Sequence, residues 1–341
     1  MIKRIRLIKL HFKKVGQGDS IIIEWECLDI KHVGIIDCNL FNDRNPTLEY
    51  LKENSIKKIE FIVISHFHSD HFSGFPDIFQ YCIDNKIYVK CCYHTIETFI
   101  IDFYEKVFTS KKIESEIRRF FETYELFDDY VKDKVQINSH LREVVLTNDI
   151  TMAFLAPEGV LYQKFGKQLS RKRNLLRVSY PDINKFSPII LIGNSTDAFL
   201  LCADAVSRSF KVLRGLSLPR IILAQVPHHG SWLSINEEFW ENLKRIDNCP
   251  AVFSIGDAPK DKLPNIETVD FFDKHDYKIY ATESVYGISD FFSVGSVLSL
   301  AGKKKQRALN TYSKVTSRTQ ITNKIDDLEG DKVFELFTPL S

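Results

Sequence analysis

Short apolar runs separated by polar and turn residues fill the first third of the chain, which predicts β-strands joined by tight turns. Gly16-Gln17-Gly18-Asp19 separates the first two runs, and glycine supplies the positive φ that a hairpin turn requires. Four consecutive apolar residues at 61–64 predict a strand buried on both faces. Strands are expected at residues 5–12, 20–25, 33–38, 61–64, 144–146, 151–156, 175–179, 189–192, 199–203, 221–226, 251–255 and 333–337.

The pattern changes to a helical one near residue 96, where apolar residues recur every three or four positions among Glu, Lys and Arg. An amphipathic helix is predicted from residues 113, 117, 120, 124 and 127, and the stretch before it predicts another. We interpret residues 95–135 as a helical insertion, for which a lid, a substrate wall and a dimer contact are alternative roles. Further helices are expected near residue 46 and at 207–215, 237–245 and 266–274.

Strand clusters with helices between them, in two successive sets, predict a layered α/β fold with mixed sheets. The 341 residues carry a net charge of +1, which argues against binding a polyanion through overall charge. No apolar run approaches the ~18 residues of a membrane helix. Seven cysteines without a CxxC pair are expected to be reduced thiols. We therefore expect a cytoplasmic protein with no membrane partner.

Metal-ligand side chains are concentrated directly after the strand at 61–64, in Ser65-His66-Phe67-His68-Ser69-Asp70-His71. His66 and His68 are two residues apart, so on an extended segment they point the same way and can reach one metal ion. If a helix begins near Asp70, then Asp70 and His71 turn toward a neighbouring position that can hold a second ion. Two metal ions about 3.5–4 Å apart are a recurring arrangement for hydrolysis of phosphate and acyl bonds.

Three other apolar strands are followed by an acid or a histidine: Asp37, Asp204 and His228. The ends of strands are the usual place for catalytic groups in α/β folds. A single Asp after a strand is most often a cap or a turn residue. The occurrence of all these residues in one chain makes coincidence a poor explanation.

His66-x-His68-x-Asp70-His71, followed by Asp204 and His228, resembles the ordered motif set of the metallo-β-lactamase superfamily. Within it, residues 1 to about 290 most resemble the nuclease-like domain of ComEC competence proteins and its stand-alone relatives. That narrower resemblance also rests on residues 15–20, 35–37, 174–178, 200–204 and 226–231. It implies a four-layer αββα sandwich of two mixed sheets at residues 1–300, with a basic C-terminal extension at 301–341 packed on it.

The resemblance also implies a centre of two divalent metal ions. The implied ligands are His66 and His68 for the first ion, Asp70, His71 and His228 for the second, and Asp204 for both. Asp70 and His229 are the implied catalytic groups, and His229 would donate to the phosphate or protonate the leaving oxygen. A purely structural role for His229 is an equal alternative. Asp37 and Asn174 would support the ligands from behind, Asp37 by orienting a ligand histidine.

The sequence departs from the superfamily pattern at one metal-ligand position. The third histidine motif, between the first cluster and Asp204, has no match, and the interval contains only His94 and His140. Ala203 replaces the usual glycine before Asp204, and a histidine expected near Pro264 is missing. An open coordination position is what a catalytic site needs, although it weakens metal affinity. The expected ions are Zn, with Mn as the alternative.

The expected activity is that of a metal-dependent hydrolase, namely a phosphodiesterase or nuclease in which a hydroxide bridging two divalent metal ions cleaves DNA or RNA. A basic run flanks Asn174, and its residues Arg171, Lys172 and Arg173 are candidate substrate contacts. A second basic run begins at Lys303.

Two alternatives to a nuclease stay open. The first is a hydrolase of a small phosphodiester, such as a nucleotide or a phosphocholine ester. The second is a non-enzymatic binding module, which the complete ligand set argues against. Hydrolysis of β-lactams or thioesters is disfavoured, because those branches of the superfamily usually keep the third histidine. A protein partner and a homodimer both stay open.

Overall fold

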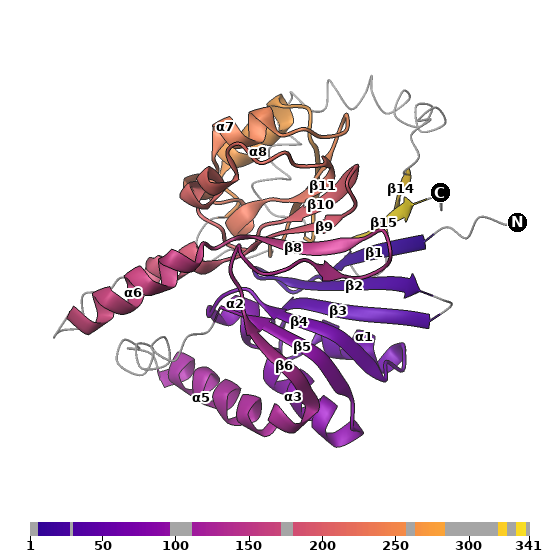
Figure 1. The fold of residues 1–341 in the computed structure, drawn as a ribbon, viewed down its shortest axis with the longest axis vertical. Coiled ribbons are helices and arrows are strands. Elements are labelled where there is room, and N and C mark those ends of the chain that lie inside the picture. The colour runs from indigo at the N-terminus through magenta and orange to yellow at the C-terminus, as the bar shows by residue number, and fades with distance from the viewer. Residues whose placement is uncertain are drawn as a thin grey trace, which may run out of the picture.

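The apolar runs of the sequence pair into two mixed β-sheets that pack face to face, with helices on both outer faces (Figure 1). The computed structural model describes residues 6–27, 30–95, 111–171, 180–256, 263–283, 320–325 and 332–338. This arrangement confirms the expected αββα sandwich, because each sheet buries one face against the other sheet and one against helices.

The first sheet has the strand order β14-β15-β1-β2-β3-β4-β5-β6. Strands β3 to β6 run parallel to one another, whereas β14, β15, β1, β2 and β3 pair in antiparallel fashion. The strands are β1 (Arg6–Phe12), β2 (Ser20–Cys27), β3 (Ile30–Cys38), β4 (Lys58–Ile64), β5 (Tyr88–His94), β6 (Val131–Gln136), β14 (Gln320–Ile325) and β15 (Lys332–Thr338).

The second sheet has the strand order β13-β12-β11-β10-β9-β8-β7. Its strands β10 to β13 are parallel, and β7 to β9 are added in antiparallel pairs. The strands are β7 (Val144–Val145), β8 (Thr151–Ala156), β9 (Ile189–Gly193), β10 (Asp197–Leu201), β11 (Arg220–Gln225), β12 (Pro250–Phe253) and β13 (Lys278–Ala281). Each sheet therefore contains a parallel half, and β4 and β10 lie in those halves.

Three apolar layers hold the sandwich together. The layer between the sheets includes Ile23, Val63 and Phe199, and the outer layers pack the helices onto the sheets. The helices on the first sheet are α1 (Pro46–Glu53), α2 (Ser69–Phe72), α3 (Phe75–Asn85) and α5 (Lys111–Leu126). Those on the second sheet are α7 (Glu237–Asn242), α8 (Ile266–Lys274) and the 3-10 helix η4 (Ser207–Leu213). Helix α6 (Gly159–Arg171) projects from the body of the molecule in Figure 1.

The helix predicted from the 113–127 pattern is confirmed as α5. Its buried Phe120 contacts Phe79 of α3, and Phe127 stacks on Phe79 with ring centroids 4.6 Å apart. Phe120 and Phe121 also pack on Phe67, the residue between His66 and His68. Helix α5 of the insertion therefore packs against the histidine-rich loop through Phe67. The helix expected before α5 lies outside the described residues.

Some local expectations differ from the structure. The helix expected at 207–215 is the 3-10 helix η4, and the strand expected at 175–179 lies outside the described residues. Neither α3 nor β6 is among the predicted elements, although the buried residues 75, 78, 79 and 82 of α3 have helical spacing; in β6, charged residues interrupt the apolar pattern. Tertiary packing on α5 and on β5 stabilises them instead.

The C-terminal extension contributes two strands to the first sheet. Strand β15 pairs with β1 from Arg6 opposite Thr338 to Phe12 opposite Lys332, and β14 pairs with β15. The basic run that begins at Lys303 lies outside the described residues. The domain boundary at residue 300 stays a prediction.

Six cysteines carry buried free thiols: Cys38, Cys82, Cys91, Cys92, Cys202 and Cys249. Cys91 and Cys92 are adjacent on β5 and both are buried, in agreement with two packing thiols on a strand. None of the helices in the described ranges combines the length and apolar character needed to cross a bilayer.

Candidate metal centre

The candidate ligands lie where parallel strands of the two sheets end. Strand β4 leads into His66 and His71, β10 leads into Asp204, and β11 leads into His228 and His229. Parallel strands place their carboxyl ends at one edge of a sheet, which collects polar side chains there. Because the two sheets face each other, this edge brings together residues from both halves of the chain.

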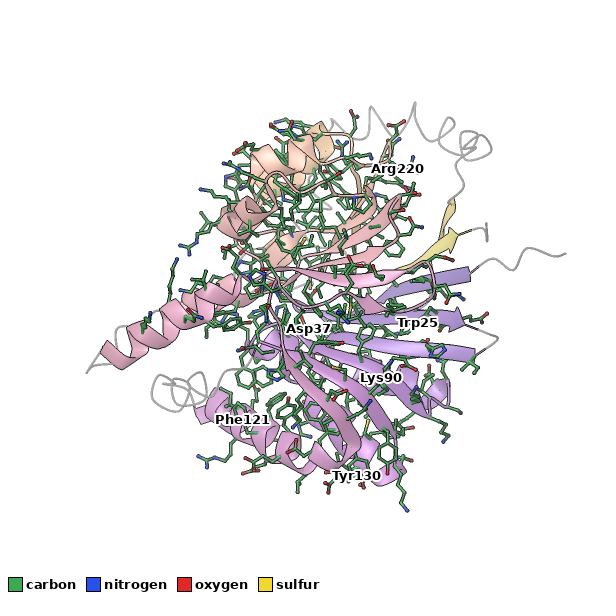
Figure 2. The ribbon with its side chains drawn as sticks, viewed as in Figure 1. Trp25, Asp37, Lys90, Phe121, Tyr130 and Arg220 are labelled. Carbon is green, nitrogen blue, oxygen red and sulfur yellow. The ribbon has the colours of Figure 1, made fainter. Side chains whose placement is uncertain are left out.

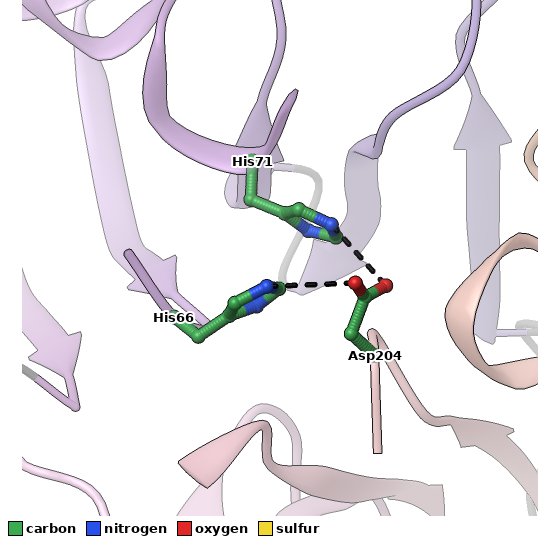
Figure 3. A group of neighbouring side chains, drawn as sticks. All are labelled: His66, His71 and Asp204. Carbon is green, nitrogen blue, oxygen red and sulfur yellow. Dashed lines mark ion pairs between the residues drawn. The ribbon is translucent and has the colours of Figure 1, made fainter. Parts of the chain in front are cut away.

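The first cluster consists of His66, His71 and Asp204, all buried (Figure 3). His66 Nε2 lies 3.5 Å from Asp204 Oδ2, and His71 Nε2 lies 3.3 Å from Asp204 Oδ1. His68 lies beside this cluster, with its Nδ1 atom 3.0 Å from His66 Nε2. Two nitrogen ligands of one tetrahedral zinc ion would be about 3.3 Å apart, given Zn–N bonds of about 2.0–2.1 Å. His66 and His68 therefore suit one ion.

The second cluster consists of Asp70, His71 and His229. His229 Nε2 lies 3.4 Å from both Asp70 Oδ2 and Asp204 Oδ1. Asp204 thus presents Oδ2 to His66 and Oδ1 to His71 and His229. One carboxylate that faces two groups of ligands is the arrangement that two neighbouring cations require.

Asp37 forms hydrogen bonds that hold the loop of residues 65–71 in place. It lies near the junction of the two sheets in Figure 2. Asp37 Oδ2 accepts a hydrogen bond from His71 Nδ1 at 2.8 Å, and Oδ1 accepts one from the Ser65 backbone N–H at 2.8 Å. The Ser65 hydroxyl donates to the same carboxylate at 2.5 Å. With its Nδ1 proton bound to Asp37, His71 presents Nε2 toward Asp204, which is the orientation that a metal ligand needs.

Burial keeps the first two histidines neutral. Burial and, to a smaller extent, the nearby His71 together lower the pKa of His66 to about 4. Burial and, to a smaller extent, His66 together lower the pKa of His68 to about 3. A neutral imidazole has a nitrogen lone pair available for a metal ion at ordinary pH.

The side chains of the second cluster and Asp204 are charged instead. Burial opposes the charge of each group, but the mutual attraction of carboxylates and imidazoles outweighs it. Asp204 and Asp70 raise the pKa of His71 well above its ordinary value, and the pKa of His229 rises to about 9. His71 in turn holds the pKa values of Asp70 and Asp204 below the ordinary range.

Several buried polar atoms at this site suit a metal ion. His71 Nε2, His229 Nε2 and Asp204 Oδ1 are buried and have no hydrogen-bond partner among the described residues. Buried polar atoms are normally hydrogen-bonded, so two such nitrogens that lie 3.3 Å and 3.4 Å from the same carboxylate oxygen require an explanation. A divalent ion bound to all three would satisfy them, and the mixed nitrogen and oxygen donors suit Zn or Mn.

A strained turn decides which of two adjacent histidines enters the site. His228 and His229 both have left-handed backbone angles, with φ of 51° and 52°. Gly230 follows at φ +84°, where an added Cβ would lie 2.6 Å from Pro264 Cβ. The turn places His229 in the buried cluster, where its Nδ1 donates to the Ser254 carbonyl oxygen at 2.8 Å, and it leaves His228 partly exposed beside Asp204.

The allocation of the two histidines differs from the sequence-based expectation. His229 is 2% exposed and joins the second cluster, in which His228 was expected. The side chain of His228 is 29% exposed, and its Nε2 lies 3.6 Å from Asp204 Oδ2. His228 is held by Ser234 Oγ at 2.9 Å and by the Asn184 amide at 3.2 Å.

Sequence analysis missed two residues at the site. Asn184 is buried against His228, whereas Asn174, Lys172 and Arg173 lie outside the described residues, as does the side chain of Arg171. Asp19, expected to be a turn residue, is also buried and lies 3.6 Å from His71 Nδ1. A signal for Asn184 was available, because it precedes the apolar strand β9 as the other site residues adjoin strands.

The charged state of His229 predicts how metal affinity depends on pH. A metal ion binds the unprotonated nitrogen, so each protonated ring that becomes a ligand releases one proton. We expect the affinity for Mn²⁺ or Zn²⁺ to rise by up to about tenfold per pH unit and per released proton, and the contribution of His229 to level off near pH 9. Titrations at pH 6.5, 7.5 and 8.5 would measure this slope, and a pH-independent affinity would contradict it.

The folding stability of the metal-free protein should depend on pH in the opposite direction to its metal affinity. The pKa of His229 is raised on folding, so its contribution to stability is complete below pH 6.5 and is lost as the pH rises through about 9. The partly exposed His275, which pairs with Glu241 away from the candidate ligands, provides a control for metal binding. His275→Gln should leave the pH dependence of metal binding unchanged.

Comparison with known proteins gives one family match and a few distant similarities. Residues 14–136 match the family described as the metallo-beta-lactamase superfamily. The Integrator complex subunit 11 homolog of Dictyostelium discoideum is 29% identical over 112 residues, which are 32% of this chain and 14% of that protein. The chain therefore matches only a small part of this relative.

Two solved structures are similar over most of the chain. The metallo-beta-lactamase fold protein YhfI from Bacillus subtilis has a TM-score of 0.44 and 9% identity, covering 82% of this chain and 98% of that one. A diphosphatase from the PhnP family has a TM-score of 0.36 and 14% identity, covering 82% of this chain and 86% of that one. The narrower resemblance to ComEC proteins stays a prediction.

Proposed function

We propose that this chain is a phosphodiesterase that cleaves DNA or RNA. Its residues 14–136 match the metallo-β-lactamase superfamily, and its buried His/Asp clusters suit a metal-dependent hydrolase. The observation that carries the proposal is Asp204, whose two oxygens face separate groups of histidines. A pair of divalent ions bound there would neutralise phosphate charge and make water acidic enough to act as a nucleophile near neutral pH.

The residues of the chain have distinct parts in this proposal. His66, His68, Asp70, His71, Asp204 and His229 would hold the ions. Asp37 and Ser254 fix the Nδ1 protons of His71 and His229, so that each ring presents Nε2 to the site. This differs from the sequence-based allocation, because His229 takes the ligand position that was expected for His228.

His228 is then available to protonate the leaving oxygen. Its side chain is more exposed than that of His229, and hydrogen bonds with Ser234 and Asn184 hold its ring. The amide oxygen of Asn184 has no hydrogen-bond partner in the described part of the chain. Rotating the amide by 180° would let this oxygen accept the Nε2 proton of His228, because the two ends of an amide are interchangeable in shape.

The placement of basic residues supports a polyanionic substrate. Helix α6 carries the exposed Lys164 and Lys167. It precedes the 3-10 helix η3 (Tyr180–Phe186), which contains Asn184. Tyr162 of α6 stacks on Phe186, two residues after Asn184, and its hydroxyl donates to the Ile137 carbonyl oxygen. The base of the helix is thus fixed beside the site, and its lysines can follow a nucleic-acid backbone that leaves it.

Salt dependence distinguishes a nucleic acid from a small phosphodiester. We expect purified protein supplied with Mn²⁺ or Zn²⁺ to cleave a fluorescent oligonucleotide. Its affinity for the oligonucleotide should fall with a slope of about −2 to −4 in a plot of log K against log salt, as three to five phosphate contacts imply. A slope near zero, with turnover of a small diester, would favour the small-substrate alternative. Two bound ions per chain without any turnover would favour a binding module.

A further inference from the structure

We propose that Asp19 and Gln225 are a pair of positioning residues that hold the loop of Asp70 and His71 and the backbone before Asp204 at a fixed separation across the two sheets. The inference rests on the proposed function, because it concerns the same metal centre. Neither residue is among the candidate ligands proposed above, although Asp19 lies in a third buried group with Asp37 and His71, and the two residues are 206 positions apart in the chain.

Asp19 is fixed to the first half of the site through its backbone. Its N–H donates to the Asp70 carbonyl oxygen at 3.0 Å, and its own carbonyl accepts from Asn39 N–H at 3.1 Å. The turn packs closely here, since a Cβ on Gly18 would lie 2.4 Å from the Asp70 carbonyl oxygen. The position of Asp19 is therefore tied directly to the backbone of a candidate ligand.

Gln225 is fixed to the second half of the site through its side chain. Its Oε1 atom accepts hydrogen bonds from the backbone N–H groups of Cys202 at 3.0 Å and Ala203 at 3.1 Å. Ala203 has a left-handed backbone with φ of 41°, which is unfavourable for alanine and must be held by its surroundings. Asp204 follows directly, so Gln225 determines the direction in which the backbone presents this carboxylate.

One hydrogen bond joins the two halves. Gln225 Nε2 donates to Asp19 Oδ2 at 2.9 Å, and both residues are 1% exposed. The contacts between the sheets are otherwise mostly apolar, and such contacts are not directional. A charge-assisted hydrogen bond in a buried place is directional and short, so it can fix the distance between ligands that come from separate sheets.

Asp19 has a second neighbour, and the experiment must separate the two effects. Asp19 Oδ2 lies 3.6 Å from His71 Nδ1, but Asp37 already accepts from that nitrogen at 2.8 Å. A role as a positioning residue needs only a hydrogen-bond acceptor at Asp19, whereas a direct effect on the ions needs its negative charge. Asparagine keeps the first property and removes the second.

A double-mutant cycle tests the pairing through metal binding. Asp19→Asn should leave the affinity for Mn²⁺ within about threefold, because the amide oxygen still accepts from Gln225. Gln225→Glu sets two carboxyl groups against each other and should weaken affinity by about 10- to 100-fold. In Asp19→Asn/Gln225→Glu the donor and acceptor are exchanged, so the bond returns and affinity should recover to within about threefold of the original.

Tyr277→Phe is the matched control. It removes a buried hydrogen bond to the Trp240 carbonyl oxygen within the second half of the chain, away from the candidate ligands. It should reduce the melting temperature without changing metal affinity. The double variant would keep the test decisive even if Gln225→Glu alone did not fold.

Three results would overturn the inference: Gln225→Glu binding Mn²⁺ as the original protein does, the double variant showing no recovery, or Asp19→Asn alone losing affinity. The readout is direct titration with Mn²⁺ and needs no substrate. An original protein that binds two ions but cleaves no phosphodiester would therefore refute the proposed function and leave this inference standing.

Discussion

Asp204→Asn is expected to reduce phosphodiester cleavage by at least about 10³-fold, which corresponds to about 4 kcal/mol of transition-state stabilisation. The reason is that, in the part of the chain that the structure describes, Asp204 is the one carboxylate within 3.6 Å of all four histidines, His66, His71, His228 and His229. Asparagine keeps the size of the side chain but offers one neutral oxygen, so it cannot serve two cations. Initial rates on bis(p-nitrophenyl) phosphate and on a labelled oligonucleotide would measure the loss.

The control for this variant is Asp247→Asn, an exposed residue in the same half of the chain. It should leave both rates unchanged. Elemental analysis of Asp204→Asn should show fewer than two ions per chain after equilibration with Mn²⁺ or Zn²⁺. If the variant kept two ions and full turnover, the assignment of a dinuclear centre around Asp204 would be wrong.

Separate alanine substitutions at the two adjacent histidines should give different defects. His229→Ala should bind one ion fewer, and its rate should fall about 10³-fold on every substrate. The reason is that His229 Nε2 lies 3.4 Å from both Asp70 and Asp204. His228→Ala should keep both ions and lose about 10²- to 10⁴-fold in kcat on an oligonucleotide, whose leaving alkoxide needs a proton.

The leaving group separates these roles further. p-Nitrophenolate leaves without protonation, so His228→Ala should lose less than about tenfold on bis(p-nitrophenyl) phosphate. His229→Ala should be equally impaired on both substrates. If His228→Ala lost an ion and His229→Ala kept both, the sequence-based allocation would hold and the one that we propose from the turn geometry would fail.

Local sequence patterns were sufficient for most of the strands and for most of the candidate ligands. Buried strands such as β4 and β10 appear as continuous apolar runs, and the ligands follow them within a few residues. His66, His68, Asp70, His71 and Asp204 could be named because spacing along an extended segment fixes which side chains share a side. The helical period of α5 was equally clear, since its inward residues pack on α3.

Tertiary contacts were needed where the choice depended on backbone geometry or on distant partners. No local pattern distinguishes His228 from His229, because both residues have left-handed backbone angles. Only the contacts of His229 with Ser254 and Asp70 show which ring is buried in the site. The same holds for Asp19, which looks like a turn residue until Gln225 is placed against it.

The sequence by itself therefore determined the layered fold, the two sets of strands and the histidine-rich loop, because these depend on residues close together in the chain. Only the tertiary structure decided that His229 enters the site, that Asn184 contacts His228, and that Asp19 joins the two sheets. These features arise when segments up to about 200 residues apart are brought to one sheet edge, and a local pattern carries no information about that approach.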